Sequence, residues 1–298
     1  MSKLPDNKKL VLINIPSTHD SASYYMNSIS GNFARTQYYP IKQQLELGIR
    51  RFDIRITKYN TKKEDEDIIC CHGICDCYAS NKFGDMKKLT YKSILLDIKD
   101  FLLKNPSEVV LMGTFLGRGN GQNLKRAYEI FIKTVGDISV EFNTKLALGE
   151  ARGKIINTTY LYEEVHKKRK IIRTRSKSVI SGTGIDSIHK KYSKHEAYKI
   201  DGNLKVREMK DMLNKFNMTI EEAEIEEKIN PTFFPLCYSI SCTGEVDICL
   251  LNPIKEARIV HSFIQRDGVL KKGYYYGWIN MDFANYESNY RFINTNFI

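Results

Sequence analysis

Ionisable side chains follow or end several short apolar runs of this sequence. His19 and Asp20 follow the run Leu10–Ile15 in the segment IPSTHDS, and His72 ends the run IICCH, where Gly73 lets the chain turn. A histidine titrates near neutral pH, so it can take or give a proton where most side chains cannot. A nearby carboxylate can orient the imidazole or stabilise its charged form. These residue types point to acid–base chemistry.

An arginine and two further carboxylates extend the set. Asp53 and Arg55 are two positions apart in RRFDIRIT, so both side chains face one side of an expected strand. Asp282 lies near the end of the last apolar run, YGWINMDF. Taken singly, Asp53 and Arg55 could be a structural ion pair, His72 a turn residue and Asp282 a helix cap. Together with His19 and Asp20 they indicate acid–base machinery around an anion.

Short β-type runs alternate with helical patterns along the chain. The expected strands are Leu10–Ile15, Arg51–Thr57, Asp67–Cys71, Val109–Phe115, Lys154–Thr159, Phe234–Ser241 and Tyr276–Phe283. Helices are expected at 40–48, 91–105, 122–135, 204–228 and 253–265. This alternation predicts a largely parallel sheet, and about eight strands in such a chain predict a barrel.

The segment between the second and third runs departs from that regularity. KYNTKKEDE is too short for a crossover helix and is typical of a hairpin loop. We therefore predict an α/β protein with a single distorted TIM (β/α)8-type barrel, forming one catalytic domain over residues 1–298. A barrel builds its site at the C-terminal ends of its strands, which is where the ionisable residues fall.

The charge favours an anionic partner. The chain has 298 residues, 42% hydrophobic, and a formal net charge of +11. Nucleic acid, phospholipid headgroups and phosphorylated small molecules all fit this charge. We see no nucleic-acid-binding motif, and the densest basic run, Lys167–Lys170, also fits a solvated loop. We therefore expect no nucleic-acid partner.

The ends and cysteines of the chain bear on location. No apolar run approaches the roughly 18 residues of a membrane-spanning helix, and the first residues contain no secretory signal core. The seven cysteines show no disulfide framework and are expected to be mostly reduced. These features predict a cytoplasmic or peripheral membrane protein, and they leave open the secretion of a trimmed chain.

Two segments carry weaker signals for ligands. CCHGICDC, residues 70–77, could bind a metal through four cysteines and a histidine, but it lacks a CxxC pair and no second pair follows. The glycine-rich segments GRGNG (117–121) and SGTG (181–184) match no phosphate-loop pattern. We therefore predict neither a metal nor another cofactor.

Six segments resemble one known family. IPSTHDS, QLELGIRRFDIRI, CCHG, KNPSEVVLMG, EARGKIIN and INMDF occur in the order seen in phosphatidylinositol-specific phospholipases C, and they look most like the bacterial, metal-independent branch. The resemblance runs from about residue 11 to residue 283. It implies a distorted TIM barrel and attack of the inositol 2-hydroxyl on its own phosphodiester. The products would be diacylglycerol and a 1,2-cyclic inositol phosphate.

The resemblance also assigns the proton-transfer roles. His19 matches the general base, and Asp282 matches the carboxylate that holds its other ring nitrogen. His72 matches the general acid that protonates the leaving glycerol oxygen, assisted by Asp20. A base and an acid in opposite protonation states imply a bell-shaped pH profile.

The groups that would hold the substrate match in part. Arg55, oriented by Asp53, stands where metal-dependent relatives bind calcium, which implies activity without calcium. Glu196 and Tyr198 in KHEAYKI match positions that contact the inositol ring.

Two inositol-contacting positions of the bacterial members have changed. Phe115 or Leu116 replaces a lysine, and Thr159 or Tyr160 replaces an arginine. These losses should weaken binding of the headgroup more than they disturb proton transfer.

The leading hypothesis is therefore a phosphatidylinositol diacylglycerol-lyase that acts as a monomer on phosphatidylinositol-containing membranes. An inositol-lipid-binding module with weak or no turnover is the alternative. A metal-dependent glycerophosphodiester hydrolase and a basic nucleic-acid binder fit the residues less well. The aromatic and apolar residues expected around the barrel mouth are Tyr24, Tyr25, Met26, Phe33, Tyr38, Tyr39, Phe233 and Phe234.

Overall fold

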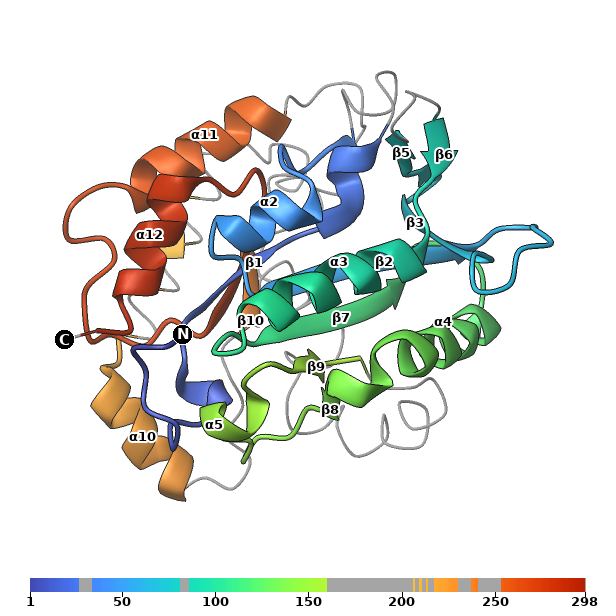
Figure 1. Cartoon of the computed structure of the whole chain (residues 1–298). Coiled ribbons are helices and arrows are strands. Elements are labelled where there is room, and N and C mark those ends of the chain that lie inside the picture. The colour runs from blue at the N-terminus through green and yellow to red at the C-terminus, as the bar shows by residue number, and fades with distance from the viewer. Residues whose placement is uncertain are drawn as a thin grey trace.

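A mostly parallel sheet forms the centre of the molecule, with helices on its outside (Figure 1). The computed structural model describes residues 1–26, 34–80, 86–159, 206, 209–210, 213, 217–229, 237–240 and 253–297. The strands are β1 (Ile15–Thr18), β2 (Arg51–Lys58), β3 (Ile68–His72), β4 (Cys75–Asp76), β5 (Tyr78–Ser80), β6 (Met86–Lys88), β7 (Val110–Leu116), β8 (Ser139–Glu141), β9 (Ile155–Asn157), β10 (Cys237–Ile240) and β11 (Trp278–Met281). The α-helices are α2 (Ile41–Glu46), α3 (Tyr91–Lys104), α4 (Gly121–Val135), α5 (Leu148–Ala151), α10 (Ile220–Ile229), α11 (Pro253–Ile264) and α12 (Tyr286–Asn294).

The main strands run in the order β10-β11-β1-β2-β7-β9-β8, and all of these neighbours are parallel. Because parallel neighbours need crossovers, helices lie between most of them, as the alternation predicted. Among the described residues no pairing joins β8 to β10. Outside the sheet, α2 packs against α3 and α3 against α4.

The antiparallel exception is also where the sequence predicted it. β3 pairs antiparallel with β2, so KYNTKKEDE connects a hairpin. β3 then pairs with β4 across a tight turn at Gly73, whose φ of +54° suits a residue without a side chain. β5 and β6 form a separate two-stranded ribbon.

One predicted strand was wrong. Leu10–Leu12 form a short 3-10 helix, and β1 begins only at Ile15. All three helical residues are buried, and the backbone N–H of Leu10 donates to the carbonyl of Leu146. A short apolar run buried on every side cannot be assigned to a strand by periodicity alone.

The alternation along β2 determines what lies inside the barrel. Phe52, Ile54 and Ile56 are fully buried in the core cluster that includes the apolar faces of α3 and α4. Because side chains alternate across a strand, Asp53 and Arg55 face the opposite side of the sheet, away from α3 and α4. A second core cluster, which contains Trp278, fills the N-terminal end of the strands.

The aromatic residues around β11 belong to the core, and the described helices are too short or too polar to span a membrane. The aromatic residues just before and within β11 pack inside, as Trp278 and Tyr275 are 2% and 1% exposed. Within the described ranges, no helix combines the length and apolar character needed to cross a membrane.

Candidate active site

His19 lies at the C-terminal end of β1, where two polar side chains fix its backbone. The His19 N–H donates to the carbonyl of Met281 on β11. The His19 carbonyl accepts from Thr36 Oγ1 at 3.0 Å and from Gln37 Nε2 at 2.9 Å, and Gln37 also donates to the Met281 carbonyl. Gln37 therefore links the ends of β1 and β11 beneath the site.

The His19 imidazole lies between two carboxylates and a guanidinium. Its Nδ1 is 2.9 Å from Asp282 Oδ1, and its Nε2 is 3.2 Å from Asp20 Oδ2. Arg55 Nη2 lies 3.1 Å from the same Nε2. Nε2 thus has an acceptor beside it when protonated and a donor when neutral, so both protonation states of His19 find a partner.

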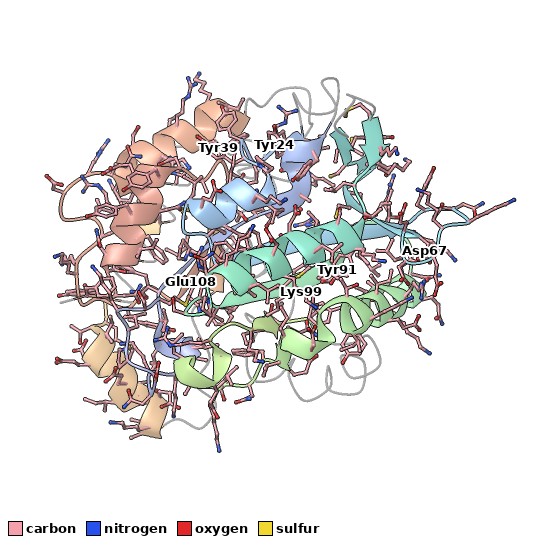
Figure 2. All side chains as sticks on the ribbon, in the orientation of Figure 1. Tyr24, Tyr39, Asp67, Tyr91, Lys99 and Glu108 are labelled. Atoms are coloured by element: carbon pink, nitrogen blue, oxygen red, sulfur yellow. The ribbon has the colours of Figure 1, made fainter. Side chains whose placement is uncertain are left out.

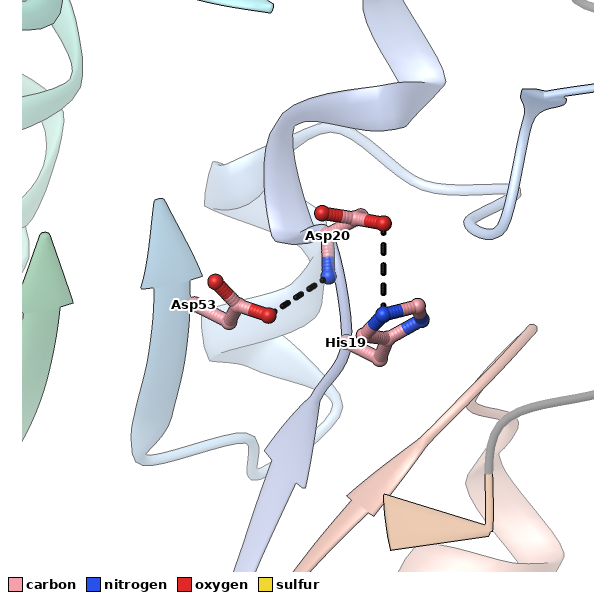
Figure 3. Close-up of side chains that lie close together, drawn as sticks. All are labelled: His19, Asp20 and Asp53. Carbon is pink, nitrogen blue, oxygen red and sulfur yellow. Dashed lines mark hydrogen bonds and ion pairs between the residues drawn. The ribbon is translucent and has the colours of Figure 1, made fainter. Parts of the chain in front are cut away.

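Asp20 is the centre of the site. Its backbone is left-handed, with φ at +43°, a conformation that aspartate tolerates better than most residues. Its backbone N–H points toward Asp53 Oδ2 at 3.3 Å, as Figure 3 shows together with the contact to His19. Its carboxylate reaches His19, His72 Nε2 at 2.8 Å, and Arg55 Nε. One buried anion therefore contacts two imidazoles and a guanidinium.

Arg55 comes from β2 and stays partly open to solvent, with 24% of its side chain exposed. Besides Asp20, it contacts Asp53 through Nη2 at 3.4 Å. Burial alone would lower the pKa of Arg55, but Asp53 and Asp20 outweigh it and raise that pKa further. The guanidinium is a fixed positive charge at the mouth of the site.

His72 closes the site from the end of β3. Its Nδ1 lies 2.7 Å from the carbonyl of Ala34, which makes Nδ1 a donor and leaves Nε2 to face Asp20. The His72 and His19 rings are 6.4 Å apart between centroids and nearly perpendicular. About a fifth of the His72 side chain is exposed, against 6% for His19.

The pKa shifts follow from these contacts. Burial would lower the pKa of His19, but Asp20 and Asp282 overcome it and raise the pKa to about 9. The pKa of His72 is also raised, because Asp20 outweighs burial. Burial would raise the pKa of Asp20, yet the two histidines and Arg55 hold it well below its usual range.

Metal binding has one candidate group within the described residues. One ligand atom each from His19, Asp20 and Asp53 lies within 4.8 Å of the others. Arg55 already contacts both carboxylates, so a cation there would share the place with a guanidinium. Cys70, Cys71, Cys75 and Cys77 are free thiols, and no metal-ligand group in the described part of the chain includes a cysteine.

The structure brings together all six residues assigned to catalysis, and it adds others. Glu196 and Tyr198, assigned to substrate binding, lie outside the described residues, as do Phe33, Phe233 and Phe234. Gln37 and Thr36, which hold the His19 backbone, had no signal in the sequence beyond being polar. Both are almost fully buried, which only the structure shows.

Comparisons with known proteins agree with the motifs. Residues 7–149 match the family model described as PI-PLC X 1. The 1-phosphatidylinositol phosphodiesterase of Listeria monocytogenes is 30% identical over 185 residues, covering 58% of this chain and 50% of that protein. The protein of the same name from Staphylococcus aureus strain Newman is 27% identical over 165 residues, covering 52% and 48%. In these matches the chain spans about half the length of the curated relatives.

Solved structures extend the likeness of fold to the whole chain. A phosphatidylinositol-specific phospholipase C from Staphylococcus aureus aligns with a TM-score of 0.68 and 19% identity, covering all of this chain and 96% of that one. The corresponding protein from Listeria monocytogenes gives a TM-score of 0.61 and 20% identity, with 100% and 98% coverage. At such identities the likeness concerns the fold alone.

The fold is similar to that of the bacterial phosphatidylinositol-specific phospholipases C, and the predicted fold class, a distorted TIM-type barrel, is confirmed. Residues 7–149 match the PI-PLC X model, which together with the curated relatives confirms the resemblance to phosphatidylinositol-specific phospholipases C.

Proposed function

We propose that this chain is a metal-independent phosphatidylinositol-specific phospholipase C. It would cleave the phosphodiester by internal attack of the inositol 2-hydroxyl, releasing diacylglycerol and a 1,2-cyclic inositol phosphate. The observation that carries the proposal is the convergence of two imidazoles, His19 and His72, on a site that also holds the fixed charge of Arg55. This is the set of groups that such a proton-relay reaction requires.

His19 is the proposed general base. Its Nδ1–H is directed to Asp282, so its Nε2 is the atom that would take the 2-hydroxyl proton. The imidazolium that forms is stabilised by Asp282 on one side and Asp20 on the other. Because the pKa of His19 is about 9 in the free protein, the neutral base becomes more abundant as the pH rises, and the acid limb of the rate profile should lie above neutrality.

His72 is the proposed general acid. Its Nδ1–H is held by the Ala34 carbonyl, so its Nε2 carries the proton that would pass to the leaving glycerol oxygen. Asp20 keeps this imidazole protonated before transfer, because it raises the pKa of His72. Its partial exposure leaves room for the diacylglycerol portion to leave.

Arg55 is the proposed stabiliser of the phosphate. Negative charge on the non-bridging oxygens grows as the pentacovalent transition state forms. A preorganised donor of this kind commonly contributes a factor of roughly 100 to 1,000 in rate. Since Arg55 is permanently charged and oriented by Asp20 and Asp53, this step needs no divalent cation.

The alternative is an inositol-lipid-binding module with little turnover. It is favoured by the two replaced inositol-contacting positions, where Phe115 or Leu116 and Thr159 or Tyr160 stand in place of charged groups. Hydrogen bonds to charged groups are worth roughly 1.5–3 kcal/mol each, so headgroup affinity would fall. The proton-transfer groups are unaffected by these changes, which is why we rank the enzyme first.

The proposed substrate surface is an anionic bilayer. Tyr24, Tyr38 and Tyr39 are each well exposed and lie on the segments that follow His19 and Asp20. Amphipathic aromatic rings and basic charge around a mouth favour peripheral docking. We propose that the chain acts there as a monomer.

Incubation with phosphatidylinositol vesicles in excess chelator, followed by phosphorus NMR of the water-soluble product, tests the proposal. We expect the cyclic phosphodiester from the wild-type protein and none from His19→Ala. Binding of vesicles without any product from the wild type would favour the lipid-binding alternative.

A further inference from the structure

The loop between β7 and α4, which the proposed reaction does not use, contacts the turn that follows His72. GRGNG provides Arg118 in this loop, and CCHGICDC contains the end of β3, the turn and β4. Arg118 Nη1 donates to the carbonyl of Ile74 at 2.7 Å, and Arg118 Nη2 pairs with the carboxylate of Asp76. Ile74 and Asp76 both follow His72 within four residues, so Arg118 binds the turn that begins directly after the proposed acid.

Asp76 is held from a second side as well. Lys88 of β6 pairs with the other carboxylate oxygen of Asp76. Burial would raise the pKa of Asp76, but the hydrogen bonds from Lys88 and Arg118 lower it, so the carboxylate stays ionised. The three side chains are 18–35% exposed, which places this cluster at the edge of the site and not in its interior.

The loop that carries Arg118 also packs directly against the catalytic strands. The Gly117 N–H donates to the Ile56 carbonyl on β2 at 2.9 Å. A side-chain carbon at Gly117 would overlap Cys71 Sγ, one residue before His72, and would lie 3.6 Å from Cβ of Arg55. This close approach fixes the backbone next to Arg118 and therefore the position from which its side chain reaches the turn.

We propose that Arg118 is a positioning residue for the general acid. By holding Ile74 and Asp76, it keeps the β3–β4 turn in the place where His72 Nε2 meets both Asp20 and the leaving oxygen. The inference rests on the proposed function, because it requires His72 to be the proton donor. Among the described residues no hydrogen bond or ion pair joins Arg118 to the His72 ring, so Arg118 acts through the turn.

The leaving group provides the test. Protonation by His72 matters for a glycerol leaving group and hardly at all for a nitrophenolate, which departs without a proton. Arg118→Gln should lower the rate on phosphatidylinositol vesicles at least about ten-fold, which is part of the roughly 100- to 10,000-fold that a general acid contributes. It should change the rate on a nitrophenyl ester of inositol phosphate less than about three-fold. His72→Ala should show the same pattern more strongly, and Arg118→Gln should add nothing to it.

Arg126→Gln is the matched control. Arg126 is similarly exposed, at 32% against 35%, and pairs with Asp67 and Glu129 on the outside of the barrel. It should leave both rates unchanged. Equal losses on both substrates in Arg118→Gln would overturn the inference, because general loosening of the fold does not distinguish leaving groups.

An NMR titration of His72 separates this inference from the proposed function. Removing a nearby positive charge would by itself raise the pKa of His72, whereas loss of its position against Asp20 would lower it. We expect Arg118→Gln to lower that pKa and Arg126→Gln to leave it alone. If the wild type cleaves neither substrate, the proposed function fails, and the titration then decides the positioning role: an unchanged or raised pKa rejects it.

Discussion

Asp282 Oδ1 lies 2.9 Å from Nδ1 of His19, and both side chains are almost completely buried. β11 and β1 are hydrogen-bonded neighbours in parallel register, so the carboxylate and the imidazole emerge from the same edge of the sheet. A buried carboxylate on one ring nitrogen fixes which nitrogen faces the substrate. This pair therefore controls both the orientation and the proton affinity of the proposed base.

Asp282→Asn should change the pH dependence as well as the rate. The amide keeps the size of the side chain but removes the charge that stabilises the His19 imidazolium. The pKa of His19 should fall from about 9, and the acid limb of the rate profile should move to lower pH. The maximal rate should drop by about 100-fold, within the range for acid–base groups. NMR titration of His19 and a pH–rate profile measure both, and an unchanged pKa would contradict the assigned role.

Arg55→Lys should show that charge alone is insufficient. A lysine keeps the positive charge but cannot present the planar fork that meets two oxygens at once. We expect a loss of roughly 100- to 1,000-fold in the rate on phosphatidylinositol. The wild-type rate should be unchanged by excess chelator.

The alternative to that prediction is a cation held by His19, Asp20 and Asp53. If it were correct, chelator would abolish the wild-type activity and calcium or magnesium would restore it. Lys104→Gln is a control, because Lys104 is 70% exposed and pairs only with Asp100 among the described residues. Its rate should equal the wild-type rate with and without chelator.

The raised pKa of His19 should also appear in the stability of the fold. The folded-state pKa of about 9 lies above the reference value of 6.5, so the protonated ring stabilises the protein fully below about pH 6.5. That stabilisation is lost as the pH rises through about 9. The advantage of the wild type over His19→Gln should shrink by on the order of 3 kcal/mol between about pH 6 and about pH 10, since one pKa unit is about 1.4 kcal/mol.

Urea unfolding of both proteins at several pH values measures this difference. Titrating groups away from the site are common to the two proteins and cancel in the comparison. His261→Gln is a useful contrast, because burial lowers the pKa of His261 and its ring is neutral, bonded to Ser288 and to the Asp282 carbonyl. Because its folded-state pKa lies below the reference value of 6.5, the contribution of His261 to stability should rise slightly between about pH 6 and about pH 7.5 and then stay constant, opposite to the trend for His19. An advantage of the wild type over His19→Gln that is constant with pH would refute the prediction.

The strands that carry the candidate site were predictable where apolar and polar residues alternate. In β2, apolar residues alternate with Asp53 and Arg55, so the sequence specified both the strand and the side that faces the site. The run Leu10–Ile15 has no such alternation, and it forms a turn of 3-10 helix before β1. Periodicity therefore predicted β2, which has one apolar and one polar face. It failed for the apolar run before β1, which is buried on every side.

The residues that form the site were easier to predict from the sequence than the contacts among them. That Asp20 meets both histidines depends on its left-handed backbone, which places its carboxylate between β1 and β3. The sequence shows the neighbours of Asp20 in the chain, but not the turn that brings it to His72. Arg118 was visible only as part of a glycine-rich segment without a known pattern, because its partners Ile74 and Asp76 lie far away in the sequence.

Two exposed tyrosines should contribute to membrane binding without contributing to chemistry. Tyr24 and Tyr39 are each 37% exposed, and both lie toward the same end of the molecule in the view of Figure 2. Tyrosine rings favour the interface of a bilayer because one end is apolar and the other polar. Tyr38 is spared in this test, because its ring packs on Phe283, next to Asp282.

The double variant Tyr24→Ala/Tyr39→Ala should bind anionic phosphatidylinositol vesicles at least about ten-fold more weakly in a sedimentation assay. Its rate on a water-soluble inositol phosphodiester should stay within about two-fold of the wild type, since no hydrogen bond or ring contact among the described residues joins either tyrosine to His19 or His72. Leu103→Ala is the control: this leucine is 68% exposed and lies at the end of α3 that leads to the N-terminal end of β7, opposite the site. Equal vesicle binding by the double variant and the control would show that the membrane meets another surface.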